Sequence, residues 1–195
     1  MAELTAAVLD TCVLIPSRLR DFLLSLAAEH CFRPVWSDEI LTEVAHHEQT
    51  RHQQFGLSKG GARDAAHRLI HQLTTTFDDS LVDGWQKLNG TFGLPDANDE
   101  HVLAVAVVAH AAVIVTNNLK DFPSQALPGG LEAITPAEFT ARIARRVPGS
   151  AANAVRQMSA RLHRPPMKPG TILDYLESHY AMTETASLIR PWLGL

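Results

Sequence analysis

The sequence of 195 residues contains little cysteine, few aromatic residues and no long hydrophobic run. Its two cysteines, Cys12 and Cys31, are too few for a disulfide framework or a four-thiolate zinc site, so we expect reduced thiols. A transmembrane helix needs about 18 apolar residues, and the best candidate, residues 102–115, is shorter and contains His110. The N-terminal sequence MAELTAAVLD also lacks the basic start and apolar run of a signal peptide. We therefore expect a cytoplasmic protein that does not interact with membranes.

Aromatic residues make up 6% of the chain, whereas apolar residues make up 46%, so the core must consist mostly of Ala, Val, Leu and Ile. This composition is typical of helices packed on a buried sheet. The net charge of −4 argues against a uniformly basic nucleic-acid-binding protein. However, residues 139–173 contain no acidic residue and seven Arg or Lys. The sequence thus leaves room for a local basic surface on an acidic protein.

Apolar patterns predict an α/β fold with a mainly parallel central sheet flanked by helices. Pro34 lacks a backbone donor and indicates that its strand lies at a sheet edge. Ser37 is a candidate N-cap, with acidic residues following it in the first turn. The expected strands are 6–9, 32–36, 113–116 and 131–134, and the expected helices are 17–30, 37–54, 62–77, 80–89 and 98–111.

The last part of the chain differs in character from the rest. Helical spacing and Pro or Gly breaks predict helices at 136–147, 151–164, 171–180 and 183–190. No strand pattern interrupts them. We therefore expect two parts, namely an α/β domain over 1–138 and a basic, all-helical C-terminal extension over 139–195.

Acidic residues stand where the chemistry of an open α/β sheet usually occurs. Asp10 follows the first predicted strand, and Thr116 and Asn118 lie at the carboxyl end of the third, so they share the carboxyl edge of the sheet. Asp99 precedes a helix that is apolar on nearly every side. Asp96 also precedes it, although a helix cap explains this residue without any function.

Two further acids extend this group. Glu43 lies beside the apolar stripe of its helix, where an unpaired carboxylate is costly, although a solvated face remains an alternative. Asp121 follows the third strand and could instead be a turn residue. If Asp10, Glu43, Asp99 and Asp121 gather at one edge, their mutual repulsion calls for a cation. Carboxylate oxygens suit Mg²⁺ or Mn²⁺ better than zinc. Thr11 could orient a ligand carboxylate by a hydrogen bond.

Four motifs carry a resemblance to PIN-domain ribonucleases, the fold of the VapC-type toxins of bacterial toxin–antitoxin modules. Each motif is weak alone, but together they follow the order of that family and span about residues 7–135. The helical tail resembles the C-terminal extension of a longer VapC subgroup. The motifs are VLDTCVLIPS (8–17), WSDEILTEV (36–44), LPDANDEHVLAVAVVA (94–109) and IVTNNLKDF (114–122).

The resemblance implies a PIN-like fold and a metal-dependent endoribonuclease that hydrolyses RNA at a Mg²⁺ or Mn²⁺ site. Asp10, Glu43 and Asp99 match the three acidic ligands of the family, and Asp121, with Asn118, falls where the fourth, more variable acid lies. A toxin of this type implies a cognate antitoxin protein as partner and allows a homodimer. An alternative is a non-catalytic PIN-fold module that binds RNA or protein. A phosphatase of the haloacid-dehalogenase type also starts with a strand-end Asp, but it expects an acid where Cys12 stands.

Basic side chains and histidines complete the predictions. Arg142, Arg145 and Arg146 are spaced to share a helix face and are candidate RNA contacts, because Arg residues that neutralise phosphates release counterions. An acidic partner protein, or acids of the α/β part, could balance the same charges. The pairs His46–His47 and His67–His71 have no assigned third ligand, and we expect them on solvated helix faces.

Overall fold

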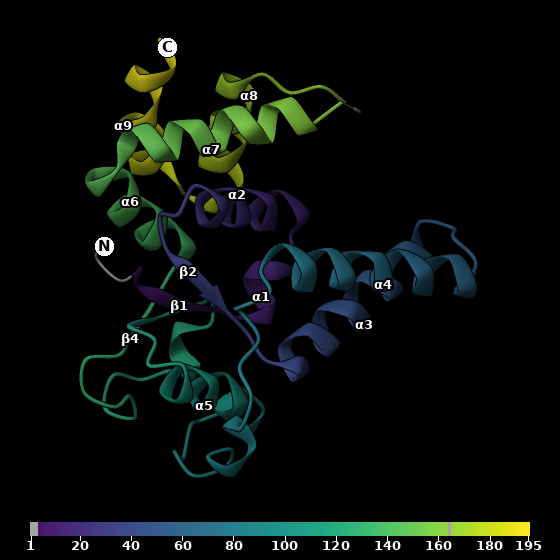
Figure 1. Cartoon of the computed structure of the whole chain (residues 1–195), viewed down its shortest axis with the longest axis vertical. Coiled ribbons are helices and arrows are strands. Elements are labelled where there is room, and N and C mark those ends of the chain that lie inside the picture. Colours follow the sequence, from purple (N-terminus) through teal and green to yellow (C-terminus); the bar gives the residue numbers. More distant parts are fainter. Residues whose placement is uncertain (1–3, 164) are drawn as a thin grey trace. The chain divides into compact units, whose positions relative to one another are not determined.

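A computed structural model describes residues 4–163 and 165–195; Arg164, which belongs to the predicted basic stretch, lies outside the described residues (Figure 1). Within this part of the chain, residues gather into two compact units. One unit combines 6–15 with 34–133, and the other combines 4–5, 16–33 and 134–195. The structure therefore assigns residues 16–33 to the same unit as the C-terminal helices.

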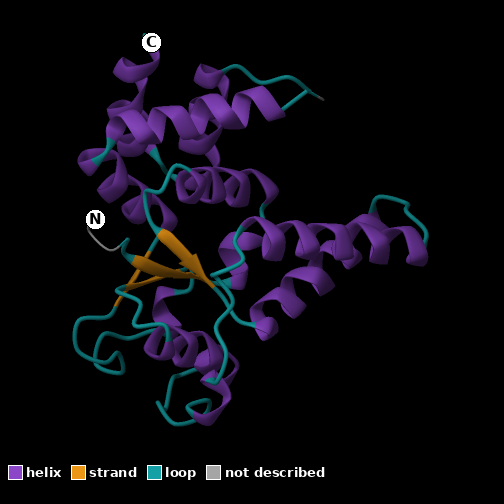
Figure 2. Cartoon of the chain, in the orientation of Figure 1, coloured by secondary structure: helices purple, strands orange, loops and turns teal. Residues whose placement is uncertain are grey.

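The centre of the first unit is a short, four-stranded parallel sheet (Figure 2). Its order is β2 (Arg33–Val35), β1 (Ala6–Leu9), β3 (Val113–Val115) and β4 (Glu132–Ile134). The four residues of β1 and the three of β3 are buried, as their continuous apolar runs predict. Leu9 pairs with Val115, so these two strands end side by side. The predicted α/β fold and the edge position of β2 are confirmed.

Helices of the same unit position the segments around the sheet edge. After β1 comes a single turn, α1 (Thr11–Leu14), which packs against α3 (Asp38–Gln54). The predicted cap is confirmed, since Ser37 Oγ accepts a 3.2 Å hydrogen bond from the amide of Ile40. α3 packs along α4 (Lys59–Thr76), and the two form a hairpin (Figure 1).

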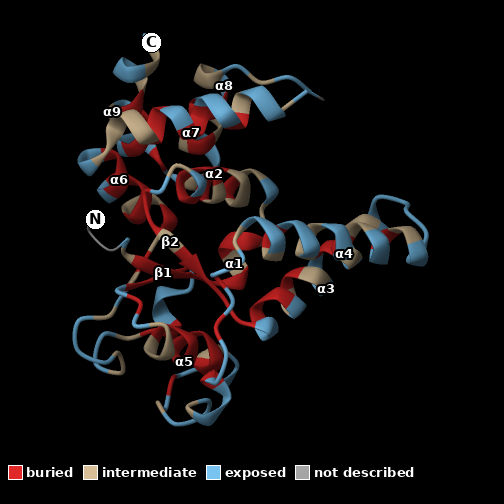
Figure 3. Cartoon of the chain, in the orientation of Figure 1, coloured by how far each residue is buried: buried red, intermediate tan, exposed pale blue. Residues whose placement is uncertain are grey.

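The most buried helix is α5 (Glu100–Val108), which packs against β1 and β3 (Figure 3). A 3₁₀ turn, η2 (Ala97–Asp99), leads into it, and another, η3 (Leu119–Asp121), follows β3. The apolar segment that predicts a helix from 98 therefore begins with a tighter turn. This turn sets Asp99 beside the sheet edge rather than inside the helix.

The prediction of a helix at 80–89 is wrong. Within this segment, only η1 (Trp85–Lys87) is helical, and that is a 3₁₀ turn. The amide of Trp36 donates to the Ser80 carbonyl at 3.0 Å, and the amide of Val82 donates to the Trp36 carbonyl at 2.9 Å. These pairings hold residues 80–82 extended, because the backbone groups that a helix would use are bonded to the segment after β2.

The second unit is helical, as predicted for the C-terminal part. It contains α2 (Ser17–Ala28), α6 (Pro136–Arg146), α7 (Pro148–Arg161), α8 (Pro169–Tyr180) and α9 (Thr183–Leu193). α2 packs on α7, while α6, α7 and α8 each pack on α9. The predicted end of the helix before Pro148 is confirmed, since α6 ends at Arg146; Pro148 also begins α7, where its missing donor costs nothing. No helix among the described residues is long and apolar enough to cross a bilayer.

Candidate functional site

Asp10 and Thr116 occupy the carboxyl ends of the two central strands. Because Leu9 pairs with Val115, the next residue of each strand lies at the same point of the sheet edge. Both side chains are buried, and Thr116 Oγ1 donates a 2.6 Å hydrogen bond to Asp10 Oδ2. The Thr116 hydroxyl also accepts a 3.0 Å bond from the amide of Asn118. The strand pairing thus fixes the Asp10 carboxylate at the sheet edge.

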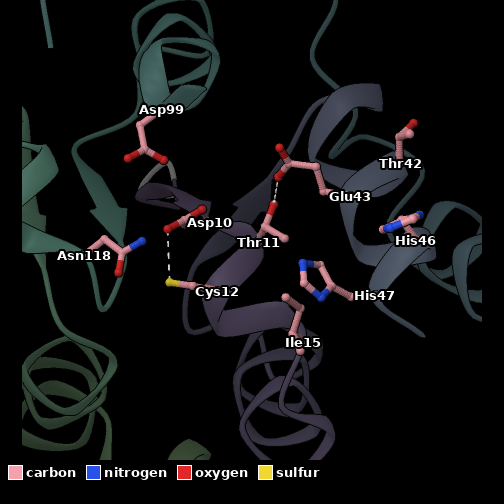
Figure 4. A pocket seen from close by; sticks show the side chains of 10 residues that line it. All are labelled: Asp10, Thr11, Cys12, Ile15, Thr42, Glu43, His46, His47, Asp99 and Asn118. Atoms are coloured by element: carbon pink, nitrogen blue, oxygen red, sulfur yellow. Dashed lines mark hydrogen bonds between the residues drawn. The ribbon is translucent and has the colours of Figure 1, made fainter. Parts of the chain in front are cut away.

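Cys12 is a second donor to the same oxygen. Its thiol lies 3.0 Å from Asp10 Oδ2 (Figure 4). Its sulfur accepts a 3.2 Å bond from the amide of Asn117. Burial and the negative charge of Asp10 raise the pKa of the Cys12 thiol to about 12. The thiol therefore keeps its proton at neutral pH and can donate it to the carboxylate. Nothing in the sequence alone indicated this contact.

Glu43 projects from α3 toward the turn that follows β1. Thr11 Oγ1 donates a short hydrogen bond to Glu43 Oε2 (Figure 4), and His101 Nε2 lies 3.5 Å from Glu43 Oε1. Burial by itself would raise the pKa of Glu43, but the hydrogen bonds from His101 and Thr11 outweigh it. The pKa of this carboxyl lies below its usual value, so Glu43 is ionised at neutral pH.

Asp99 faces the other acids of the site. Burial, together with the charges of Asp10, Asp121 and Asp96, raises its pKa from the usual 3.8 to about 6. Such an increase is the electrostatic mark of carboxylates held near one another without a compensating cation. Asp96 itself is exposed and caps η2, since its Oδ1 accepts a 2.9 Å bond from the amide of Asn98. The capping alternative for Asp96 is therefore realised in the structure.

Asp121 lies close enough for its charge to act on Asp99, yet it is not among the residues that line the cavity described below. It is buried at the end of η3, with Lys120 Nζ 3.7 Å from its Oδ1. Asn118, at the start of the same turn, does line the cavity. Of the two candidates for a fourth ligand position, Asn118 is thus the one that lines the cavity.

A cavity of about 530 Å³ is lined by Asp10, Glu43, Asp99 and residues near them, all of which belong to the first unit (Figure 4). Sequence reasoning missed Cys12, Ile15 and Thr42 as lining residues. The exposed pair His46–His47 also lines it, and the spacing of one turn from Glu43 along α3 is the signal that could have indicated this. The full lining is Asp10, Thr11, Cys12, Ile15, Thr42, Glu43, His46, His47, Asp99 and Asn118.

The donor set fits a hard divalent cation by its chemistry. Three carboxylates, those of Asp10, Glu43 and Asp99, line one cavity, and such oxygen ligands suit Mg²⁺ or Mn²⁺. Within residues 4–163 and 165–195, however, no three His, Cys, Asp or Glu side chains form a ready metal-binding group. The carboxylates line the same cavity without forming a ready coordination group among the described residues.

The three arginines predicted to contact RNA are exposed on α6. Each also has a partner within the second unit. Arg142 Nε donates to Glu138 at 2.8 Å, and Arg145 Nε donates to Glu184 at 2.7 Å. Arg146 donates to the Cys31 carbonyl at 3.0 Å. Acids of the helical unit itself therefore balance two of these charges, and contact with RNA stays a prediction.

Comparison with known proteins agrees with this architecture. A family model described as a PIN domain matches residues 6–120, which include the whole cavity lining. A second model, described as the VapC50 C-terminal domain, matches residues 134–191, which contain the helices from α6 to α8 and most of α9. No curated protein and no solved structure matches this chain. The chain therefore belongs to the PIN-domain family and has the C-terminal extension of a VapC-type member.

Proposed function

We propose that this protein is a Mg²⁺- or Mn²⁺-dependent endoribonuclease and the toxin of a type II toxin–antitoxin module. One observation carries the proposal: Asp10, Glu43 and Asp99, which come from three separate segments of a PIN domain, line one cavity at the carboxyl edge of the sheet. The raised pKa of Asp99 supports it, because acids at this spacing repel unless a cation neutralises them.

In this proposal Asp10, Glu43 and Asp99 hold the cation, with Asn118 or Asp121 as the fourth position. When bound, Mg²⁺ or Mn²⁺ supplies charge neutralisation at the phosphate and activation of a water molecule. Hydrolysis joins the water oxygen to phosphorus and breaks the bond from phosphorus to a ribose oxygen, which takes up a proton. The chain's own part is to fix its carboxylates, through Thr116 and Cys12 on Asp10 and through Thr11 on Glu43.

The functional division we propose keeps residues 1–138 as the catalytic domain and 139–195 as the basic extension. Every cavity residue lies in the unit formed by 6–15 and 34–133, which supports catalysis by the first part. For the extension we propose RNA contact by Arg142, Arg145 and Arg146. A cognate antitoxin, which in a cell would hold the toxin inactive, is the proposed protein partner, and a homodimer is compatible with this assignment.

A non-catalytic PIN module remains the second candidate, and one observation favours it. Among the described residues no ready metal-binding group is present, and one oxygen of Asp10 and one of Glu43 already accept internal hydrogen bonds. In such a module the acids would be structural, and RNA or protein binding would not require a divalent cation.

Cleavage of RNA by the purified chain separates the two candidates. We expect cleavage with Mg²⁺ or Mn²⁺, loss of cleavage with a chelator, and loss in Asp10→Asn and Asp99→Asn. Asp64→Asn is a matched control, because Asp64 is an exposed acid on α4 that does not line the cavity. Full activity in the chelator, or in Asp10→Asn, contradicts the metal mechanism. RNA binding without cleavage under every metal condition favours the non-catalytic module.

A further inference from the structure

His101 is an unusual residue for the interior of α5. It is 6% exposed and lies in a helix whose neighbouring residues from Val102 to Ala106 are apolar and buried. An apolar side chain would fill this position without the cost of burying an imidazole. The mechanism outlined above does not use this histidine, so its presence calls for a physical reason.

The two ring nitrogens of His101 have different surroundings. Nε2 lies 3.5 Å from Glu43 Oε1, whereas Nδ1 is buried and has no hydrogen-bond partner among the described residues. A buried N–H without an acceptor is more costly than a buried lone pair of weak basicity. Among the described residues only Nε2 faces an acceptor, so an N–H on Nε2 that is directed at Glu43 suits these surroundings.

The ring has a fixed position because of a second contact. Its centroid lies 5.9 Å from that of Trp85, and the indole Nε1 donates a 3.1 Å hydrogen bond to Asp38 Oδ1 at the start of α3. Trp85 is buried. The imidazole is thus packed against a side chain that is itself tied to the helix carrying Glu43.

The carboxylate of Glu43 is consequently contacted on both oxygens. Thr11 bonds Oε2, and His101 approaches Oε1. Thr11 is the residue after Asp10, and His101 is two residues after Asp99. The two side chains that contact the Glu43 carboxylate therefore come from the segments that carry Asp10 and Asp99.

We infer that His101 is a positioning residue, which together with Thr11 sets the orientation of the Glu43 carboxylate toward the cavity shared with Asp10 and Asp99. This inference rests on the proposed function, because it assigns to Glu43 a cation that the proposed function requires. A histidine that served only the core would act through packing, and its effect would not depend on Glu43.

Direct measurement of Mn²⁺ affinity on the full chain tests the role without relying on activity. His101→Phe keeps an aromatic ring beside Trp85 and removes the donor, and because no described residue bonds to Nδ1, no second hydrogen bond is lost. His101→Gln is the matched control, since its amide nitrogen can still donate. We expect His101→Phe to bind Mn²⁺ at least about tenfold more weakly, and His101→Gln to stay within about threefold of the parent.

A double-variant comparison distinguishes positioning from packing. In a Glu43→Gln background the ligand to be oriented is already altered, so adding His101→Phe should change Mn²⁺ affinity no further. If His101→Phe binds Mn²⁺ like the parent, or if its effect is undiminished in the Glu43→Gln background, the positioning role is wrong. His101→Leu removes the same donor if the Phe variant does not melt cooperatively, and failure of both to fold assigns His101 to the core instead.

Mn²⁺ binding by the unsubstituted parent protein tests the proposed function itself. A parent that binds no Mn²⁺ contradicts the metal site as a whole, and with it this role for His101. A parent that binds Mn²⁺ while His101→Phe binds it equally well contradicts the positioning role alone. The two failures are therefore distinct.

Discussion

Thr116 Oγ1 donates a 2.6 Å hydrogen bond to Asp10 Oδ2 and so joins two residues that are 106 positions apart in the sequence. Parallel pairing of β1 with β3 brings the two strand ends together, and the hydroxyl then meets a buried carboxylate. Hydrogen bonds to a buried charge stabilise more than those between neutral groups. This contact therefore contributes both to the fold and to the geometry of the candidate site.

Replacement of Thr116 by Val tests that contribution. The isosteric change removes the donor and leaves Asp10 partly unsatisfied, so we expect the free energy of unfolding to fall by about 2 kcal/mol. Urea unfolding at neutral pH measures it. Thr116→Ser keeps the hydroxyl and should lose about 1 kcal/mol or less, the value for one methyl group. Equal losses in both variants would show that the hydrogen bond adds nothing.

The fold could be predicted where a local pattern determines the structure. The apolar run 6–9 gives β1, Pro34 lies in an edge strand, and Ser37 caps α3. The one-turn helix α1 (Thr11–Leu14) was not predicted, since four residues are too few to show a period. The prediction of a helix at 80–89 was wrong because backbone hydrogen bonds with Trp36 hold residues 80–82 extended.

For the site, sequence could select the acids and suggest Thr11 as a hydrogen-bond partner, but it could not indicate the other partners. Asp10, Glu43 and Asp99 line one cavity. The sequence selected Asp10 and Asp99 by their places at the ends of elements, and Glu43 by its position beside the apolar stripe of its helix. Cys12 escaped prediction because its contacts depend on the turn α1 and on the pairing of β1 with β3. His101 escaped it because its contact with Glu43 depends on how α5 and α3 are placed around the sheet edge. Asp121 could be placed near the site from the chain order, but its exclusion from the cavity lining depends on the conformation of η3.

The lowered pKa of the buried Glu100 carboxyl predicts that the stability of the fold depends on pH. Burial would raise its pKa, but the amides of Leu94 at 2.8 Å and Phe92 at 3.0 Å donate to its carboxylate and lower the pKa below its usual value. A lowered folded-state pKa stabilises the protein above the unfolded-state pKa, and this stabilisation is lost as the pH falls through the folded-state value.

We therefore expect Glu100→Gln to be less stable than the parent by about 2 kcal/mol at pH 7, with the difference shrinking below about pH 4. Chemical unfolding across a pH series, with Asp64→Asn as a control at an exposed acid, provides the measurement. A difference that is constant from pH 7 to pH 3 would show that the charge of Glu100 contributes nothing.

The raised pKa of Asp99 predicts the opposite dependence of stability on pH in chelator-treated protein. Burial and the nearby acids raise its pKa to about 6, so its ionised form destabilises the fold above that pH, and stability is regained as the pH falls from about 6 toward 4. Asp99→Asn should consequently be more stable than the parent at pH 7.5, by on the order of 1 kcal/mol, and lose this advantage near pH 4. Melting curves in a chelator test this, and a variant that is less stable at pH 7.5 would contradict clustering of the acids.

The arginines of α6 offer a test in two directions. Arg142 pairs with Glu138, and Arg145 pairs with Glu184, so their charges are partly compensated within the helical unit. If these two residues and Arg146 contact phosphates, replacing all three by Ala should weaken RNA binding and reduce the salt dependence of affinity by about 2 in logarithmic slope. Replacing Glu138 and Glu184 by Gln should strengthen binding, because the guanidinium groups are released. A salt series with a catalytically inactive Asp10→Asn parent measures both effects without cleavage. If neither the triple Ala variant nor the double Gln variant alters the salt dependence of RNA affinity, these arginines serve only the packing of α6 against its neighbours.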